Sequence, residues 1–310
     1  MERGDLAPVV LFVYNRPEHT QKTLNSINLL PEAGQTDLYI YADQAKNERA
    51  QSSVDAVRAI VSAFVDNQSH FRSAKLICAS ANQGLAKSII SGVSRIIDEY
   101  GRVIVLEDDL EVAPDFLSYM NGALEYYQDQ ESIWAISGYT FPMHALHDYP
   151  HDVYLCGRGC SWGWATWKDR WNTVDWEVKS YPKFKFNFFE RNKFAQWGRD
   201  LPTMLDAYMY GEIHSWAIRW CYEAFRQHKY TIYPVVSRIK NHGTDGSGTN
   251  FNKESTAQYD TYISDGASSI TFAMPPVNTK IQREFSAKYL QGIQYFKVLL
   301  RWFIIRLTRK

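Results

Sequence analysis

The sequence predicts an α/β fold built on a mostly parallel sheet, and three observations lead to that prediction. Short apolar runs alternate with amphipathic stretches over the first 110 residues, which is the pattern of successive β-α-β units. Hydrophobic residues make up 45% and charged residues 22% of the 310 positions, as is typical of a globular protein. No internal repeat or low-complexity tract interrupts the chain, so one elaborated domain is favoured over two separate ones.

Strands and helices are expected in strict alternation over the first 110 residues. Pro17 suits the first turn of a helix, because its missing N–H would have no helical partner there. Asn15, two residues earlier, is a candidate cap for that helix. Strands are predicted at 8–14, 37–42, 75–81 and 102–106, and helices at 17–30, 47–65 and 83–100.

This alternation ends after Leu110. An aromatic, glycine-containing stretch, CGRGCSWGWATW, begins at Cys156, and a glycine-rich polar stretch, NHGTDGSGTNFN, begins at Asn241 and is expected to be a loop. Helices are predicted at 114–127 and 215–227, and strands at 133–137 and 230–233. We divide the predicted fold into a subdomain at 1–110, a subdomain at 111–280 and a terminal helix at 281–310.

The composition restricts the class of protein. The net charge is zero, so no overall field attracts nucleic acid. Ten Trp and twenty Tyr suit a protein that stacks rings on sugars or bases, although large aromatics also serve to fill a core. Four cysteines, at 78, 156, 160 and 221, match neither a disulfide framework nor a zinc motif, and we expect reduced thiols in a cytosolic protein. We find no secretory signal and no membrane-spanning run.

The most informative segment is RVIVLEDDLEVAPDF, in which an apolar strand leads directly into Glu107, Asp108 and Asp109. In an open parallel sheet, ligands bind beyond the carboxyl ends of the strands. Three adjacent carboxylates repel one another unless a cation compensates them. Mg²⁺ or Mn²⁺ can bind carboxylate oxygens and a diphosphate at the same time. The acidic segment therefore predicts a metal-assisted reaction at this edge of the sheet. The alternative is a solvated strand end that caps the next helix.

The longer segment LEDDLEVAPDFLSYM resembles the acidic motif of the N-acetylglucosaminyltransferase I family of inverting glycosyltransferases. VYNRPEHTQKTL, YIYADQ, SANQGLAKSI, GWATW and IYPVVSRIKNHG follow in the order of that family. The chain is also similar to bacterial sugar transferases that carry an N-x-G-x-DGSGT loop. The resemblance implies a GT-A-type fold, with a mostly parallel Rossmann-like sheet flanked by helices and a C-terminal acceptor region, and a nucleotide-sugar donor, most simply a UDP-sugar.

The resemblance also implies roles for individual residues. Asp109 becomes the direct ligand of Mn²⁺ or Mg²⁺, while Asp108 and Glu107 contact the ribose and the donor sugar. Arg16 matches a nucleotide-binding arginine, and Asp43 matches an acid that faces the base. A salt bridge between Arg16 and Asp43 at the sheet edge is the alternative.

Two further donor contacts follow from the same resemblance. Asn82 lies near the position of a histidine that lies near the uracil in the family. Because this sequence has no histidine there, the identity of the nucleotide base is left open. The alternative for residues 82–84 is a turn and helix cap. The loop at 241–249, which contains Gly243, Gly246, Ser247 and Gly248, matches a segment that closes over the donor. Its glycines permit such a movement, and its N–H groups suit phosphates. A plain flexible connection is the alternative.

An inverting transferase needs a general base for the acceptor hydroxyl. The tryptophan of the family falls on Trp216, and Ala217 occupies the place of the aspartate that should follow. Glu212, Asp245 and His214 are the candidate substitutes, in that order. If none serves, the chain is a non-catalytic relative that binds nucleotide sugar. A sugar-nucleotide nucleotidyltransferase is a further alternative, although VYNRPEHT lacks the glycine-rich basic loop of such enzymes.

The last segment, KYLQGIQYFKVLLRWFIIRLTRK, contains six Lys or Arg residues and no acid. It predicts an amphipathic helix whose aromatic and basic residues suit a membrane interface. A helix docked on the domain itself or on a second subunit would show the same pattern. If this helix contacts a membrane, the expected acceptor is a glycan or lipid-linked saccharide. The protein is then expected in the cytoplasm, peripheral on the inner membrane.

Overall fold

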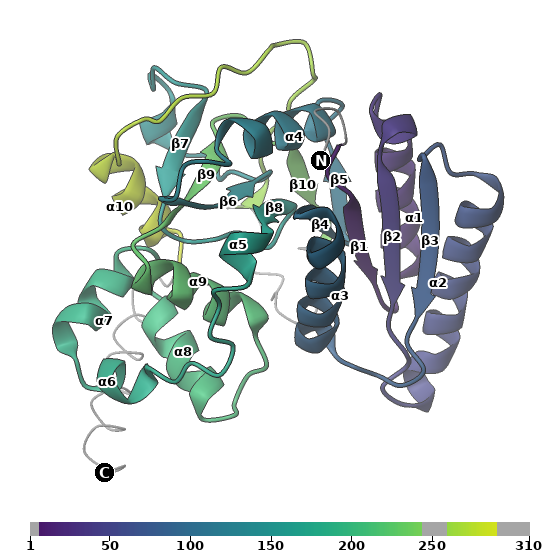
Figure 1. Ribbon diagram of the computed structural model, residues 1–310, viewed down its shortest axis with the longest axis horizontal. Coiled ribbons are helices and arrows are strands. Elements are labelled where there is room, and N and C mark those ends of the chain that lie inside the picture. The colour runs from purple at the N-terminus through teal and green to yellow at the C-terminus, as the bar shows by residue number, and fades with distance from the viewer. Residues whose placement is uncertain (1–5, 244–258, 290–310) are drawn as a thin grey trace.

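The computed structural model describes residues 6–243 and 259–289, and the account below refers to these residues. One large sheet runs through the molecule in the strand order β3-β2-β1-β4-β8-β6-β9-β7 (Figure 1). Its strands are β1 (Val9–Val13), β2 (Asp37–Ala42), β3 (Ser73–Cys78), β4 (Arg102–Glu107), β6 (Ile133–Ser137), β7 (Val153–Cys156), β8 (Trp164–Trp167) and β9 (Tyr230–Pro234). A second, antiparallel pair joins β5 (Leu110–Val112) to β10 (Ile239–Asn241).

The first four strands are parallel, as the alternation of apolar and amphipathic segments predicts. β1 pairs with β2 on one side and with β4 on the other, and β3 pairs with β2. The connecting helices are α1 (Pro17–Asn28), α2 (Glu48–Asn67) and α3 (Leu85–Tyr100). The expected cap at Asn15 is wrong, because Arg16 is the N-cap residue of α1 and makes no side-chain cap bond.

Alternate residues of these strands face two separate cores, because successive side chains of a strand point to opposite faces. Val9, Leu11 and Val13 pack with residues of α1 and α2. Val10 and Phe12 pack with residues of α3 on the other face. The chain therefore changes both its direction of travel and its side of the sheet between β1 and β4. Such a switch point is where open α/β sheets bind ligands.

The sheet is mostly parallel, as predicted, and it becomes mixed beyond β4. β8 lies between β4 and β6 and is antiparallel to both. β9 is parallel to β6, and β7 is antiparallel to β9. The predicted helices at 114–127 and 215–227 are α4 (Phe116–Tyr126) and α9 (Trp216–Arg226). The remaining helical elements are α5 (Lys168–Trp171), α6 (Tyr181–Lys185), α7 (Phe188–Ala195), α8 (Leu201–Met209), α10 (Thr279–Ala287), η1 (Ala33–Gln35) and η2 (His144–Leu146).

Five tryptophans fill the core beneath α9. Trp134 and Trp220 have ring centroids 4.3 Å apart, and Trp164 lies 5.0 Å from Trp216 and 5.8 Å from Trp171. All five are buried. For these residues the high aromatic content is therefore core packing and not a surface for stacking on sugars.

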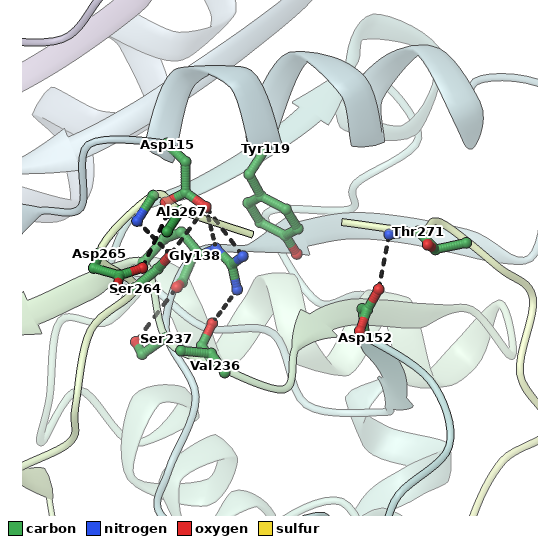
Figure 2. Close-up of polar contacts among 12 residues, drawn as sticks. Asp115, Tyr119, Gly138, Asp152, Val236, Ser237, Ser264, Asp265, Ala267 and Thr271 are labelled. Atoms are coloured by element: carbon green, nitrogen blue, oxygen red, sulfur yellow. Dashed lines mark hydrogen bonds and ion pairs between the residues drawn. The ribbon is translucent and has the colours of Figure 1, made fainter. Parts of the chain in front are cut away.

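The segment before α10 is fastened across the second half of the sheet (Figure 2). Arg238 pairs with Asp115 at 3.1 Å, and Ser264 donates to the same carboxylate oxygen at 3.1 Å. Farther along, the Thr271 N–H donates to Asp152 at 2.8 Å. α10, at Thr279–Ala287, overlaps only the first residues of the terminal helix predicted at 281–310 and ends before the basic segment that begins at Lys288. Residues 290–310 lie outside the described part of the chain.

The four cysteines are free thiols, as expected, and two of them, Cys156 and Cys221, are buried. Within residues 6–243 and 259–289, no helix combines the length and the apolar character needed to cross a membrane.

Candidate active site at the ends of β1 and β4

The acidic motif lies at the switch point of the sheet. β4 ends at Glu107, and Asp108 and Asp109 form the turn that leads into β5. Arg16 follows the neighbouring strand β1 and begins α1. The register of the two strands, in which Phe12 lies beside Glu107, brings the residues that follow them to the same edge. Parallel pairing thus places a basic and an acidic segment together although about ninety residues separate them.

Arg16 holds the acidic turn. Its Nη2 forms an ion pair with Asp108 Oδ1 and a second one with Asp109 Oδ2 at 2.9 Å. The Tyr14 N–H donates to Asp108 Oδ2 at 3.3 Å, and the Thr23 hydroxyl donates to the Asp108 carbonyl at 2.9 Å. Asp108 is only 4% exposed. Its carboxylate is therefore a fixed, hydrogen-bonded part of the turn.

The pKa values in the turn are shifted because three carboxyl groups lie close to one guanidinium group, that of Arg16. Burial and the charges of Asp109 and Asp108 raise the pKa of Glu107 to about 8, against the opposing effect of Arg16. Burial also raises the pKa of Asp108, although Arg16 works in the other direction. For Arg16, burial alone would lower the pKa, but the two aspartates outweigh it and raise the pKa. An additional cation at this edge would relieve the repulsion that remains.

A second element closes on Asp109 from the far end of the chain. β10 pairs with β5, and the His242 N–H, just after β10, donates to the Asp109 carbonyl at 2.8 Å. The His242 ring lies 2.6 Å from the Glu111 carboxylate. Gly243 leaves no space for a side chain, since a Cβ there would lie 2.0 Å from Asp109 Oδ2 and 3.0 Å from Arg16 Nη1. The sequence patterns did not point to His242 or Glu111 as site residues, and they pointed to Gly243 only as one of the glycines that let the loop move. The sequence feature that could have indicated His242 and Gly243 is the HG pair near the beginning of the glycine-rich stretch.

Asp43 and Asn82 lie together at the ends of β2 and β3. Asp43 accepts hydrogen bonds from the N–H groups of Gln83 at 2.8 Å and Gly84 at 2.9 Å, and from the Asn82 amide at 3.2 Å. Gly84, with φ of 72°, is the N-cap residue of α3, so the suggested turn and helix cap is present here. The suggested Arg16–Asp43 salt bridge is wrong, because Arg16 forms its ion pairs with Asp108 and Asp109.

The candidate bases lie on a different element. Glu212 and His214 are exposed in the connection between α8 and α9. Ser215 caps α9 by accepting from the Ile218 N–H at 3.3 Å, so Ala217 lies in the first turn of this helix. Asp245, Gly246 and Ser247 fall outside the described residues.

Few protein ligands for a metal come together in the described parts of the chain. Over 6–243 and 259–289, no group of three or more His, Cys, Asp or Glu side chains is arranged to hold a metal ion.

Comparisons with known proteins match this part of the chain. Residues 87–212 match the model of the GNT-I family. An α-1,3-mannosyl-glycoprotein 2-β-N-acetylglucosaminyltransferase from Arabidopsis thaliana is 29% identical over 116 residues, which cover 37% of this chain and 26% of the relative. The crystal structure of S. aureus TarS aligns with a TM-score of 0.30 at 15% identity, covering 42% of this chain and 21% of that one. The match over residues 87–212 confirms the resemblance to these glycosyltransferases.

Proposed function

We propose that this chain is a metal-dependent, inverting glycosyltransferase that moves a sugar from a UDP-sugar to a glycan or lipid-linked saccharide. One observation carries the proposal: Arg16 pairs with Asp108 and Asp109 at the switch point between β1 and β4. This is the edge at which an open α/β sheet binds nucleotides. The match of residues 87–212 to the GNT-I family supports the same reaction class.

Asp109 is the proposed metal ligand. Its carboxylate is 14% exposed at the rim of the turn, whereas that of Asp108 is 6% exposed and lies deeper against Arg16. When bound, Mn²⁺ or Mg²⁺ offsets the charge that develops on the leaving diphosphate. Arg16 lies beside the same carboxylate and offers its remaining N–H groups to phosphate oxygens. Asp108 and Glu107 face the ribose and the donor sugar in this scheme.

The nucleoside has its proposed place at the ends of β2 and β3. Asp43 holds the backbone N–H groups of Gln83 and Gly84, and Asn82 is exposed next to it. Gly246 and Ser247 are proposed to contact the phosphates through backbone N–H groups, and Gly243 brings the beginning of their loop against Asp109. Asp43 thus acts by holding the segment at 83–84 in place more than by touching the base of the nucleotide.

The general base is proposed among Glu212, Asp245 and His214. It takes the proton of the acceptor hydroxyl while the oxygen of that hydroxyl attacks the anomeric carbon and the bond to the diphosphate breaks. Replacing the residue that acts as the general base by Gln should lower kcat by about 10²–10⁴-fold and leave donor affinity unchanged. If all three variants keep full activity, the base is elsewhere.

Two other functions remain as alternatives. A non-catalytic relative would bind the nucleotide sugar without turnover, and Ala217 in place of the family aspartate favours this reading. A nucleotidyltransferase would release pyrophosphate from a sugar phosphate and a nucleoside triphosphate. Slow donor hydrolysis without acceptor would support the transferase against both. A lipid-linked acceptor would also agree with a cytoplasmic protein held at the inner membrane by the predicted helix at 281–310.

The decisive experiment is calorimetric titration with UDP-, GDP-, CMP- and dTDP-sugars, each with and without Mn²⁺. We expect one nucleotide, UDP, to bind with Mn²⁺ and to lose at least about tenfold in affinity in Asp109→Asn, since the charge of the carboxylate ligand is lost. Asp55→Asn, an exposed change on α2, is the matched control and should bind normally. Unchanged metal and nucleotide binding in Asp109→Asn contradicts the proposal.

A further inference from the structure

Arg219 of α9 carries a positive charge with which no carboxylate of the described residues forms an ion pair. Its Nε donates to the Ser215 carbonyl at 3.1 Å and its Nη1 to the Trp176 carbonyl at 3.2 Å, and both of these acceptors are uncharged. Three other arginines of this half of the molecule each form an ion pair with an aspartate, namely Arg158, Arg191 and Arg238. Arg219 is therefore bound in place by the protein without being neutralised by it.

The surroundings of Arg219 disfavour a charge that has no counter-ion. Its guanidinium carbon lies 4.7 Å from the ring centroid of Tyr208 and 5.4 Å from that of Trp176. Burial lowers the pKa of Arg219, and the nearby Tyr208 and Glu177 oppose this effect only in part. Aromatic faces stabilise a cation more weakly than a carboxylate does. A partly buried cation in this position is costly to the free protein, and an anion bound there would offset the cost.

The turn that supplies the Trp176 carbonyl is held in a strained conformation. Val178 has φ of 54°, which is rare for a β-branched residue, and its side chain is 2% exposed. Asp175 holds the turn by accepting a hydrogen bond from the Lys179 N–H at 2.7 Å. Strained residues of this kind persist where the surrounding structure fixes them, and they gather at binding sites. The turn and the beginning of α9 together hold the guanidinium of Arg219 from two sides.

Arg219 belongs to the part of the molecule in which the acceptor is expected. α9 packs in the same core as α3, the helix that begins beside Asp43. The connection between α8 and α9 carries the candidate bases Glu212 and His214. In Figure 1 this connection lies toward the same lower end of the molecule at which β1, β2 and β3 end. An anion bound at Arg219 would thus lie on the acceptor side of the proposed active site.

We propose that Arg219 binds an oxyanion of the acceptor, a phosphate or a carboxylate carried beside its sugar. A guanidinium keeps its charge and forms strong, charge-assisted hydrogen bonds to the oxygens of either group. Trp176 and Tyr208 are partly exposed beside it, and aromatic side chains suit the apolar face of a saccharide. The assignment of the anion to the acceptor rests on the proposed sugar transfer, whereas the anion site itself does not.

The test is calorimetric titration of the full chain with glucose 1-phosphate, glucuronate and glucose at constant ionic strength, without nucleotide or metal. We expect an anionic sugar to bind and glucose to bind at least about tenfold more weakly. The anionic sugar should lose at least about tenfold in affinity in Arg219→Gln, because a hydrogen bond to a charged group is lost. Arg219→Lys should keep part of the affinity, since the charge remains. The tighter of the two anionic sugars distinguishes a phosphate from a carboxylate.

Matched controls separate this site from other cations. Arg226→Gln changes an arginine of the same helix that is already paired with Glu223, and it should bind like the wild type. Arg16→Gln should also keep the anionic sugar, whereas UDP-sugar binding with Mn²⁺ should be unchanged in Arg219→Gln. The donor site and the Arg219 site can therefore fail independently. Circular dichroism checks that each variant is folded. The inference is overturned if neither anionic sugar binds the wild type, or if Arg16→Gln abolishes the binding and Arg219→Gln does not.

Discussion

Arg16 Nη2 lies 2.9 Å from Asp109 Oδ2, so a cation that follows β1 and an acid that follows β4 meet at one point of the sheet. The same guanidinium also pairs with Asp108. The positive charge of Arg16 thus reduces the repulsion between the neighbouring carboxylates of the turn.

Replacing Arg16 should therefore destabilise the protein. In Arg16→Gln, Asp108 stays buried without its partner, and the free energy of unfolding at pH 7 should fall by about 1–3 kcal/mol. Urea denaturation measures this. The double variant Arg16→Gln/Asp108→Asn should recover part of the loss, whereas Arg49→Gln on α2 should have no effect. The Asp108→Asn single variant completes the cycle, and a double-variant loss equal to the sum of the two single losses would show that the pair is not coupled.

Gly243 should be intolerant of even one methyl group. A Cβ would lie 2.0 Å from Asp109 Oδ2, so Gly243→Ala should displace this carboxylate and weaken metal-dependent nucleotide binding by about tenfold or more. Gly34→Ala is the control, since its Cβ would meet only the His70 carbonyl at 3.8 Å. Calorimetric titration of both variants decides the matter, and equal affinities would contradict this account of the site.

Asp37 should make stability depend on pH. Hydrogen bonds, first from Arg72 and then from Ser73 and Tyr100, outweigh burial and lower the pKa of Asp37 to about 2. The folded state thus prefers the ionised form, and the contribution is present at neutral pH and lost as the pH falls from about 4 towards 2. Asp37→Asn should cost about 1–2 kcal/mol at pH 7, because Arg72 is 41% exposed and the pair is screened.

Urea unfolding at pH 7 and pH 3 checks this sign. The gap between wild type and Asp37→Asn should narrow at the lower pH, while Asp55→Asn should not reproduce the change. A gap that widens on acidification would show that the pKa is shifted the other way.

Asp206 of α8 should be a costly site to replace, because it forms a buried ion pair with Arg191 of α7. Its side chain is 7% exposed and that of Arg191 is 8% exposed, so Asp206→Ala leaves a buried charge without its partner. The free energy of unfolding should fall by about 3–5 kcal/mol. Arg191→Met/Asp206→Leu should be closer to the wild type, because no charge stays buried. A loss under about 1 kcal/mol in Asp206→Ala would contradict the pairing.

The sequence by itself determined the first half of the fold. β2 begins and ends where the apolar run predicted, and α3 ends at the expected Tyr100. The acidic motif follows β4 as expected. These features are local, because the spacing of apolar residues and the position of prolines and glycines act within one element.

Only the tertiary structure decided which distant residues meet. It brings His242 and Gly243 to Asp109, pairs Arg16 with Asp108 instead of Asp43, and inserts β8 antiparallel between β4 and β6. It also separates the phenylalanines that fill the core from those that are displayed, although Phe184 and Phe186 stand two residues apart. Pairing of strands and docking of helices depend on contacts between segments far apart in the chain, and no local pattern encodes them.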